Sequence, residues 1–456
     1  MKGLPLDTSA PPTRDHRPGA APLVFALVVF ALVLSSCSVA TETTGSGGSS
    51  SGNGTTSASS LSGTGAPTST TTTRVPPPPP APVNYSRPGP YEVGFTTLSL
   101  GDRSVRVFYP ASSTGLDGLE RLTSYRPGDA YPPEVAALLS ATVPPLVADL
   151  PLDAYLDAPI NDEGPFPVIL QSHGAGGSNL YSSQHLRQEA SWGFVVAAPD
   201  HLSRNEIASV ANQWGGTPTD LDDLANSLAA LVTANASPDS VLGGGLDTQR
   251  VGVEGHSAGA AAAYLFALAE PRVKVWIGQA PAPAVSPAGA EPPLDRPAMI
   301  VAADADALVS LGLAQTQYDG ITPPKRLVVV QRAGHSTFLD RCQAIFAAGG
   351  LASFLETYPQ LAALLEGSGD GCAPGNVDPV AAAELIDHVM IAQYRLAFGD
   401  DPTDVSLDPA YLARTFPEAF ASEQADPPQA TSSPVPRPSA TIPGALESTT
   451  VPASAP

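Results

Sequence analysis

The sequence predicts an α/β fold with a mostly parallel central sheet and helices on both of its faces. Short apolar runs alternate with amphipathic stretches through the middle of the chain, as in sheets built from strand–helix units. Some runs are continuously apolar, such as FVVAA at 194–198, which is typical of parallel strands buried on both faces. Ligand sites in this architecture lie at the carboxyl ends of the strands, so the residues that follow each strand are the first candidates for function.

The expected elements alternate along the folded part of the chain. Strands are predicted at 105–109, 168–170, 194–198, 251–253, 273–277, 299–302 and 327–330, and helices at 181–192, 219–233, 257–269 and 308–318. Residues 111–165 interrupt this alternation with many prolines and aspartates and one short helical piece at 133–139. We expect an insertion after the first strands, which either covers the active site as a lid or pocket wall or forms a surface loop.

The composition excludes one class of partner. The formal net charge is −22, and nucleic-acid binding needs a basic surface to contact phosphates. No nucleic-acid partner is therefore expected. The two ends of the chain are low in complexity, and residues 85–420 are left for one folded domain, which is long enough to bury a large core.

The N-terminus has the pattern of an export signal. Basic residues precede an apolar run at 20–34, which is shorter than the roughly 20 residues of a membrane span and suits the apolar region of a secretory signal. The run ends in Leu34-Ser35-Ser36-Cys37, which resembles the lipobox of bacterial lipoproteins. That resemblance implies lipidation of Cys37; an uncleaved anchor and an ordinary signal with a stray cysteine are the alternatives.

The segments beside the folded domain are compositionally biased. Residues 38–84 are rich in Ser, Thr, Gly and Pro, and residues 421–456 are rich in Pro, Ser and Thr; both are expected to be disordered. The predicted organisation is a signal peptide at 1–37, a linker at 38–84, the domain at 85–420 and a tail at 421–456. We expect an exported protein held on the outer face of the cell membrane, with secretion as the alternative.

Two cysteines remain after Cys37. Cys342 and Cys372 lie within the predicted domain, and an even pair in an exported protein predicts a disulfide. Closing a loop of that size stabilises a fold by roughly 3–4 kcal/mol in the chain-entropy description. Two free thiols are the alternative.

The segment VGVEGHSAGA at 251–260 has the pattern of a nucleophile elbow. An apolar strand runs into Gly255-His256-Ser257-Ala258-Gly259, and small helix-forming residues follow at once. In such an elbow the serine occupies a strained turn between strand and helix, and the glycines leave room for the crowded backbone. A glycine-rich turn that happens to hold a serine is the alternative.

The groups that would activate Ser257 follow in the required order. A serine nucleophile needs a base, and the base needs an acid to orient it. Strand 299–302 runs into a loop with Asp304 and Asp306, and strand 327–330 runs into a loop with His335. The sequence therefore predicts a Ser257, Asp306, His335 triad, with Asp304 as the rival acid.

Together these motifs resemble the α/β-hydrolase superfamily, and more narrowly the bacterial relatives of platelet-activating-factor acetylhydrolase and dienelactone hydrolase. The resemblance covers about 88–400 and includes GPYEVGFTTLSL, FPVILQSHGAGGSNLYSS, GFVVAAPDH and GHSAG. It implies Asp306 as the acid, although Ala303 replaces the family's usual glycine. It also implies an oxyanion hole from the backbone N–H groups of Ala175 and Ala258. Dienelactone hydrolases use a cysteine nucleophile, so serine at this position disfavours their activity.

The other histidines receive structural interpretations. His173 and His256 are expected to pack or orient loops, His185 to lie on a helix face or the surface, His201 to line the pocket or cap a turn, and His388 to be structural. The sequence has no His, Cys and Glu grouping with metal-ligand spacing, so neither a metal nor another cofactor is expected.

The prediction for function is an exported serine hydrolase that cleaves small-molecule or lipid carboxylic esters through an acyl-enzyme. Related acyl chemistry on the same residues remains open, namely phospholipid acetyl ester hydrolysis, polyester hydrolysis or acyl transfer to an envelope acceptor. A binding lipoprotein without catalysis is the alternative from another class, although a binding role would not need all three triad groups.

Overall fold

The computed structural model describes residues 80–130, 133–142, 149–211, 213–216, 219–286, 289–290, 293–359, 362 and 369–427. The predicted signal peptide with Cys37, most of the linker and most of the tail lie outside the described residues. None of the described helices combines the length and the apolar character that a membrane crossing requires.

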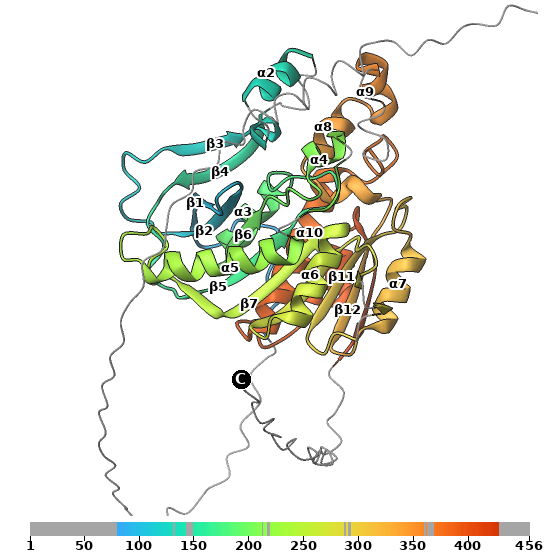
Figure 1. Cartoon of the computed structure of the whole chain (residues 1–456). Coiled ribbons are helices and arrows are strands. Elements are labelled where there is room, and N and C mark those ends of the chain that lie inside the picture. Colours follow the sequence, from blue (N-terminus) through green and yellow to red (C-terminus); the bar gives the residue numbers. More distant parts are fainter. Residues whose placement is uncertain are drawn as a thin grey trace, which may run out of the picture.

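One large sheet forms the centre of the domain (Figure 1). Its strands follow in the spatial order β13 (Phe420–Asp426), β12 (Lys325–Val330), β11 (Ala298–Ala303), β8 (Val273–Gln279), β7 (Leu246–His256), β5 (Phe166–Ser172), β6 (Val195–Pro199), β2 (Ser104–Ala111), β1 (Glu92–Ser99), β4 (Leu150–Leu156) and β3 (Arg121–Tyr125). The six strands from β12 to β6 pair in parallel. All the strands predicted from the sequence are present, and the predicted mostly parallel sheet is confirmed.

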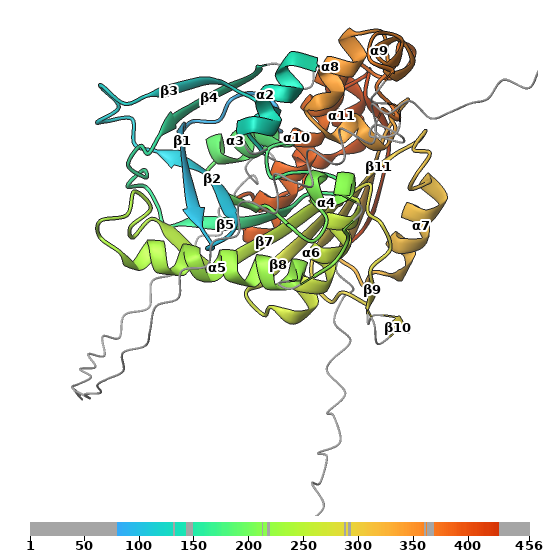
Figure 2. The same ribbon diagram turned by 45° about the horizontal axis from the view of Figure 1, so that its top comes forward.

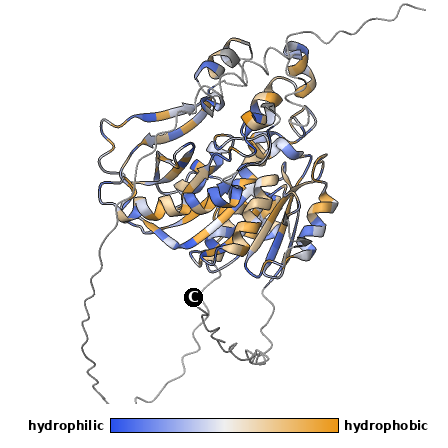
Figure 3. Cartoon of the chain, viewed as in Figure 1, coloured by the Kyte–Doolittle hydropathy of each residue, from blue (hydrophilic) through white to orange (hydrophobic). Residues whose placement is uncertain are grey.

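Alternate residues of the central strands point into two separate cores. On β5, Ile169 joins one core with α3 (Ser183–Ser191) and α10 (Pro379–Phe398). Its neighbours Val168 and Leu170 join the other core with α5 (Asp220–Ala236), α6 (Ala258–Ala269) and α7 (Leu311–Gly320). Helices therefore cover both faces of the sheet, as predicted, and Figure 2 shows the layers from a second side. Helix α5 alternates hydrophobic and hydrophilic residues along its length (Figure 3), as expected for a helix with one buried side.

Local sequence signals fix the helix ends. Thr219 caps α5 through a capping box with Asp222. Helix α10 begins after the cap Asp378 with a proline in its first turn, and it ends at Gly399 in the left-handed conformation. The remaining elements are short: α2 (Pro133–Thr142), α4 (Glu206–Ala211), α8 (Arg341–Ala347), α9 (Leu351–Thr357), α11 (Pro409–Thr415), β9 (Val285–Ser286), β10 (Gly289–Ala290) and the 3-10 turns η1 (Pro127–Ala130), η3 (His335–Phe338) and η5 (Val405–Leu407).

Two boundary predictions need correction. The insertion at 111–165 is not only loop and helix, because β3 and β4 within it extend the sheet beyond β1. The tail does not begin at 421, because residues 420–426 form β13 and pair with β12 along its length. Strands β3 and β13 lie at the two edges of the sheet and contain many polar residues. Such strands lack the apolar pattern from which strands are predicted.

His388 fastens the start of the domain to its last long helix. The backbone N–H of Tyr85 donates to His388 Nδ1 at 3.0 Å, and His388 Nε2 donates to the carbonyl of Ser406 at 2.7 Å. Both ring nitrogens are therefore used by a neutral imidazole with the proton on Nε2. Burial lowers the pKa of His388 from 6.5 to about 4. The structural interpretation of this residue agrees with these contacts.

We expect His388 to make the domain sensitive to acid. Its pKa is lower in the folded chain than in the unfolded chain, so the unfolded state binds the proton first as the pH falls. The stabilisation is complete above about pH 6.5 and declines towards pH 4, by roughly 3 kcal/mol in total. Denaturant titrations at several pH values should show a smaller decline for His388→Gln than for the wild type. Equal declines in both proteins would contradict the assignment.

Candidate active site

Ser257 occupies the turn between β7 and α6. The strand ends at His256, the helix begins at Ala258, and Ser257 between them has a φ of 55°. This is the left-handed region, which costs a residue other than glycine about 1–3 kcal/mol and is common at functional sites. The side chain of Ser257 is half-buried. The predicted elbow geometry is therefore present.

The two glycines of the elbow are required by close backbone contacts. A Cβ on Gly259 would stand 1.9 Å from the carbonyl oxygen of Ser172 on β5, and a Cβ on Gly255 would stand 2.4 Å from the backbone of Gly259. Since real Cβ contacts are much longer, any side chain at either position would push α6 away from the sheet. The glycines thus allow the helix to begin directly above the strand ends.

Asp306 and His335 are in direct contact. The Nδ1 atom of His335 lies 2.8 Å from Oδ2 of Asp306, and the Asp306 side chain is fully buried. The other oxygen of Asp306 accepts the backbone N–H groups of Leu308 and Val309 at 2.8 and 2.7 Å. Asp304, the rival acid, is exposed. The structure therefore brings His335 together with Asp306 and not with Asp304.

Ser257 and His335 line a common cavity of about 180 Å³. Ala175 lines the same cavity, together with His173, Gly174 and Gly177 of the glycine-rich loop after β5. Three loops that follow β5, β7 and β12 at their carboxyl ends thus contribute to one cavity, although β8 and β11 separate β7 from β12 in the sheet. The described residues that line it include none from the insertion at 111–165, so the described part of that insertion gives no support to the lid or pocket-wall alternative.

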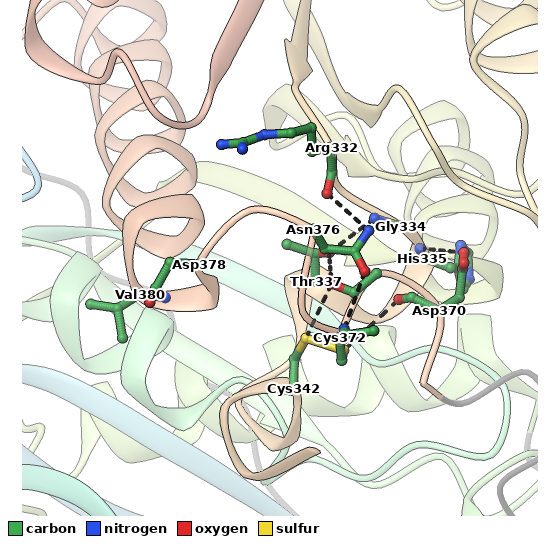
Figure 4. Close-up of a disulfide and its surroundings, with 12 residues drawn as sticks. Arg332, Gly334, His335, Thr337, Cys342, Asp370, Cys372, Asn376, Asp378 and Val380 are labelled. Carbon is green, nitrogen blue, oxygen red and sulfur yellow. Dashed lines mark hydrogen bonds between the residues drawn. A yellow bond between two sulfur atoms is a disulfide. The ribbon is translucent and has the colours of Figure 1, made fainter. Parts of the chain in front are cut away.

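Asp370 links the acid loop to the histidine loop, a role that the sequence did not reveal. Its Oδ2 atom accepts the backbone N–H of His335 at 2.8 Å and that of Ala307 at 2.9 Å. The backbone carbonyl of Asp370 also accepts the N–H of Ser336. Two residues further on, Cys372 is bonded to Cys342, so the structure contains the predicted disulfide. Figure 4 shows Asp370 and the disulfide beside the segment that carries His335.

We expect Asp370→Ala to lower kcat by about tenfold to a hundredfold, because the loss of its two hydrogen bonds frees both the acid loop and the histidine loop to shift. Asp370→Asn is the matched control, since its amide oxygen can accept the same two N–H groups and should preserve most of the activity. Steady-state kinetics on a short-chain ester would check this. Wild-type kcat in the alanine variant would show that Asp370 has no positioning role.

Arg204 positions the loop that carries Ala175. Its guanidinium donates to the carbonyl of His173 and to the hydroxyl of Ser172, and its own carbonyl accepts the N–H of Gly176 at 2.8 Å. Ala175 is exposed towards the cavity between these fixed points. Ala258 is the first residue of α6, so its N–H has no acceptor within the helix. Both predicted oxyanion donors thus belong to backbone that is held in place.

A second Ser-His-Asp arrangement lies beneath this loop. The Oγ atom of Ser172 is 2.9 Å from Nε2 of His201, and Nδ1 of His201 is 3.0 Å from Oδ2 of Asp223. All three residues are fully buried, and none is among the residues that line the cavity. Arg204 also donates to the Ser172 hydroxyl. Burial lowers the pKa of His201 well below its ordinary value, so this set is a buried structural network.

The remaining histidines also orient backbone. His173 accepts the N–H of His201 at 3.0 Å through Nε2, and His256 donates to the carbonyl of His335 at 2.9 Å. Burial lowers the pKa of His256 well below its ordinary value, and the neighbouring His335 lowers it further. His185 lies on a face of helix α3, as one of its two interpretations predicted, but the surface alternative is wrong because the side chain is buried against Glu189 and Glu254.

A larger cavity of about 400 Å³ lies between α6 and α7. Its described lining consists mainly of small and apolar side chains, and none of the predicted site residues belongs to it. Size alone therefore does not identify the site; the candidate is the smaller cavity, to which the elbow serine and the paired histidine both belong.

Fold and site together define an α/β-hydrolase. Two family models match the chain: PET hydrolase-like over residues 181–354, and platelet-activating factor acetylhydrolase, isoform II, over residues 84–221. Both are families of serine ester hydrolases within the α/β-hydrolase superfamily, and this chain has the fold of that superfamily. The predicted resemblance to the acetylhydrolase group is thereby confirmed. No curated protein matches the chain by sequence.

Proposed function

We propose that the protein hydrolyses carboxylic esters through an acyl-enzyme intermediate. The Ser257 hydroxyl attacks the ester carbonyl while His335 takes its proton. His335 then donates that proton to the departing alcohol. Water, deprotonated by the same imidazole, releases the acid and restores the serine. Asp306 keeps the proton of neutral His335 on Nδ1 and stabilises the imidazolium that forms during each half of the reaction.

The oxyanion of each tetrahedral intermediate is assigned to the backbone N–H groups of Ala175 and Ala258. Donors that are already fixed where negative charge develops need no reorganisation during the reaction, and one such donor is typically worth about a hundredfold to a thousandfold in kcat. The hydrogen bonds of Arg204 support this role, since they fix the loop on both sides of Ala175.

The observation that carries the proposal is the position of His335. One ring nitrogen contacts the buried carboxylate of Asp306 at 2.8 Å, and the residue lines the cavity that Ser257 reaches from its strained turn. A base oriented by an acid and adjacent to a reachable hydroxyl is what acyl transfer requires.

Labelling by a fluorophosphonate tests the proposal and separates the two Ser-His-Asp arrangements. Such a probe phosphonylates an activated serine, and we expect mass spectrometry to place the adduct on Ser257. Ser257→Ala should not react, whereas Ser172→Ala should still be labelled, because the Ser172 hydroxyl is buried. An adduct on Ser172, or equal labelling of the Ser257→Ala variant, would overturn the assignment.

We also propose that the chain is exported and attached to the membrane through a lipid on Cys37. Support comes from the sequence alone, namely the apolar run at 20–34 that ends at this cysteine and the Ser/Thr-rich spacer after it. Cys37→Ser should move the protein from the membrane fraction to the soluble fraction of fractionated cells. An unchanged membrane fraction would show that the apolar run itself is the anchor.

A further inference from the structure

A group of buried polar side chains lies between α3, β7 and α10, outside the proposed hydrolase site. Helix α3 contributes His185 and Glu189, β7 contributes Glu254, and α10 contributes Asp387 and Tyr394. Glu189 and Glu254 are fully buried, and His185 is 8% exposed. An imidazole and a carboxylate from α3 thus meet a carboxylate from β7 in the layer between the sheet and its helices.

The spacing of their polar atoms is that of ligands around an ion. The Nε2 atom of His185 lies 3.4 Å from Oε1 of Glu189 and 3.5 Å from Oε1 of Glu254, and the donor atoms of all three residues lie within 4.8 Å of one another. Two ligands that bind one tetrahedral zinc ion at about 2.0–2.2 Å stand roughly 3.3–3.6 Å apart. The observed distances are longer than good hydrogen bonds between nitrogen and oxygen.

The atoms that face one another have no hydrogen-bond partner among the described residues. They are Nε2 of His185, both carboxylate oxygens of Glu189 and Oε1 of Glu254. A buried polar atom without a partner costs roughly 1–3 kcal/mol, and a charged one costs more. These four atoms belong to three residues whose ligand atoms lie together, and they would supply four donors to a zinc ion if Glu189 bound it through both oxygens.

The outward atoms of the same residues are held as metal ligands usually are. The Nδ1 atom of His185 contacts Oδ1 of Asp387 at 2.5 Å, and the Tyr394 hydroxyl donates to Oε2 of Glu254 at 2.9 Å. A carboxylate on the far nitrogen of a ligating histidine fixes the tautomer that presents Nε2 to the ion. This contact also fixes the orientation of the imidazole ring.

The charge of the group favours a divalent cation. Throughout the described part of the chain, no lysine or arginine forms an ion pair with Glu189, Glu254 or Asp387; their recorded ion-pair partner is His185. Buried carboxylates need a compensating charge. One divalent ion would neutralise Glu189 and Glu254 together.

We propose that His185, Glu189 and Glu254 bind a divalent transition-metal ion of the Zn²⁺ type, which ties α3 to β7. Imidazole nitrogen with carboxylate oxygen in a four-donor set suits zinc. His185 and Glu189 stand one helical turn apart, although no metal site was expected from the sequence. The third ligand could not be found without the fold, because Glu254 meets them only through the packing of α3 on the sheet.

Metal analysis of the full chain tests the site. Protein refolded with Zn²⁺, without a metal-affinity tag, and dialysed against metal-free buffer should retain about one equivalent of zinc by plasma mass spectrometry. Glu189→Gln and Glu254→Gln should each weaken zinc binding at least a hundredfold, and Asp387→Asn about 10–100-fold. Asp340→Asn is the matched control. Asp340 is also buried, but its carboxylate accepts a hydrogen bond from the Tyr125 hydroxyl, so this substitution should leave the zinc content unchanged.

Two results would overturn the site. One is less than a tenth of an equivalent of zinc in the refolded wild type. In that case the two carboxylates would share a proton and no metal would be bound. The other is a full equivalent that persists in both glutamine variants, which would place the zinc elsewhere. If a variant fails to fold, Co²⁺ loading of the wild type decides the question. Visible absorption bands of tetrahedral Co²⁺ support the site, and their absence after loading overturns it.

Discussion

Replacing Ser257 with alanine should lower kcat for ester hydrolysis by about 10⁴–10⁶-fold, the range that follows when the serine nucleophile of such a triad is lost. Alanine keeps the Cβ and therefore the same backbone strain at a φ of 55°, so the melting temperature should change little. Steady-state rates on a short-chain ester, measured beside a thermal unfolding curve, check both expectations.

A double variant supplies the control for this prediction. Groups that act as one unit are strongly non-additive, so adding His335→Ala to Ser257→Ala should cost almost nothing further. A second large loss in the double variant would mean that Ser257 and His335 act in separate steps. The proposed proton transfer between them would then be wrong.

The second large effect concerns the two aspartates of one loop. We expect Asp306→Asn to lower kcat by up to about 10⁴-fold. The N–H groups of Leu308 and Val309 hold one carboxylate oxygen of Asp306, so the oxygen of an asparagine will occupy that position. Its NH₂ group then faces Nδ1 of His335, which must become an acceptor. The proton moves to Nε2, and that nitrogen can no longer accept the proton of Ser257.

Asp304→Asn is the matched control for this experiment, because Asp304 lies two positions earlier in the same loop and is exposed. Its kcat should stay within about twofold of the wild type, since surface substitutions usually have small effects. If Asp304→Asn is the inactive variant and Asp306→Asn is active, the contact between Asp306 and His335 is not the catalytic one.

The motif residues of the site could be predicted because each signal is local. An apolar strand, followed at once by a serine between glycines or by a histidine, places a group at a known edge of the sheet. Asp370 could not be predicted in this way. Its carboxylate contacts backbone 35 and 63 positions earlier, and no local pattern marks an aspartate that accepts two distant N–H groups.

The fold shows the same division. Buried strands such as β6 and β12 can be predicted because burial on both faces requires a run of apolar residues, which the sequence shows at 194–198 and 327–330. The outer strands β3 and β13 expose many of their residues, and their polar sequences do not show the apolar pattern that predicts a strand. The cluster around His185 was missed for a related reason: Glu254 is one residue of a buried strand, and only the sheet register shows which helix it meets.

The connection between β3 and β4 and the segment between η3 and α10 differ in how freely they could be redesigned. Strands β3 and β4 join the outer margin through β1, so an engineer could shorten or exchange the connection between them while leaving the reacting atoms where they are. The stretch between η3 and α10 offers no such freedom. In this stretch Asp370 accepts the backbone N–H of His335, and Cys372 forms a disulfide with Cys342. A replacement segment must therefore reproduce both the hydrogen bond and the disulfide to keep the enzyme active.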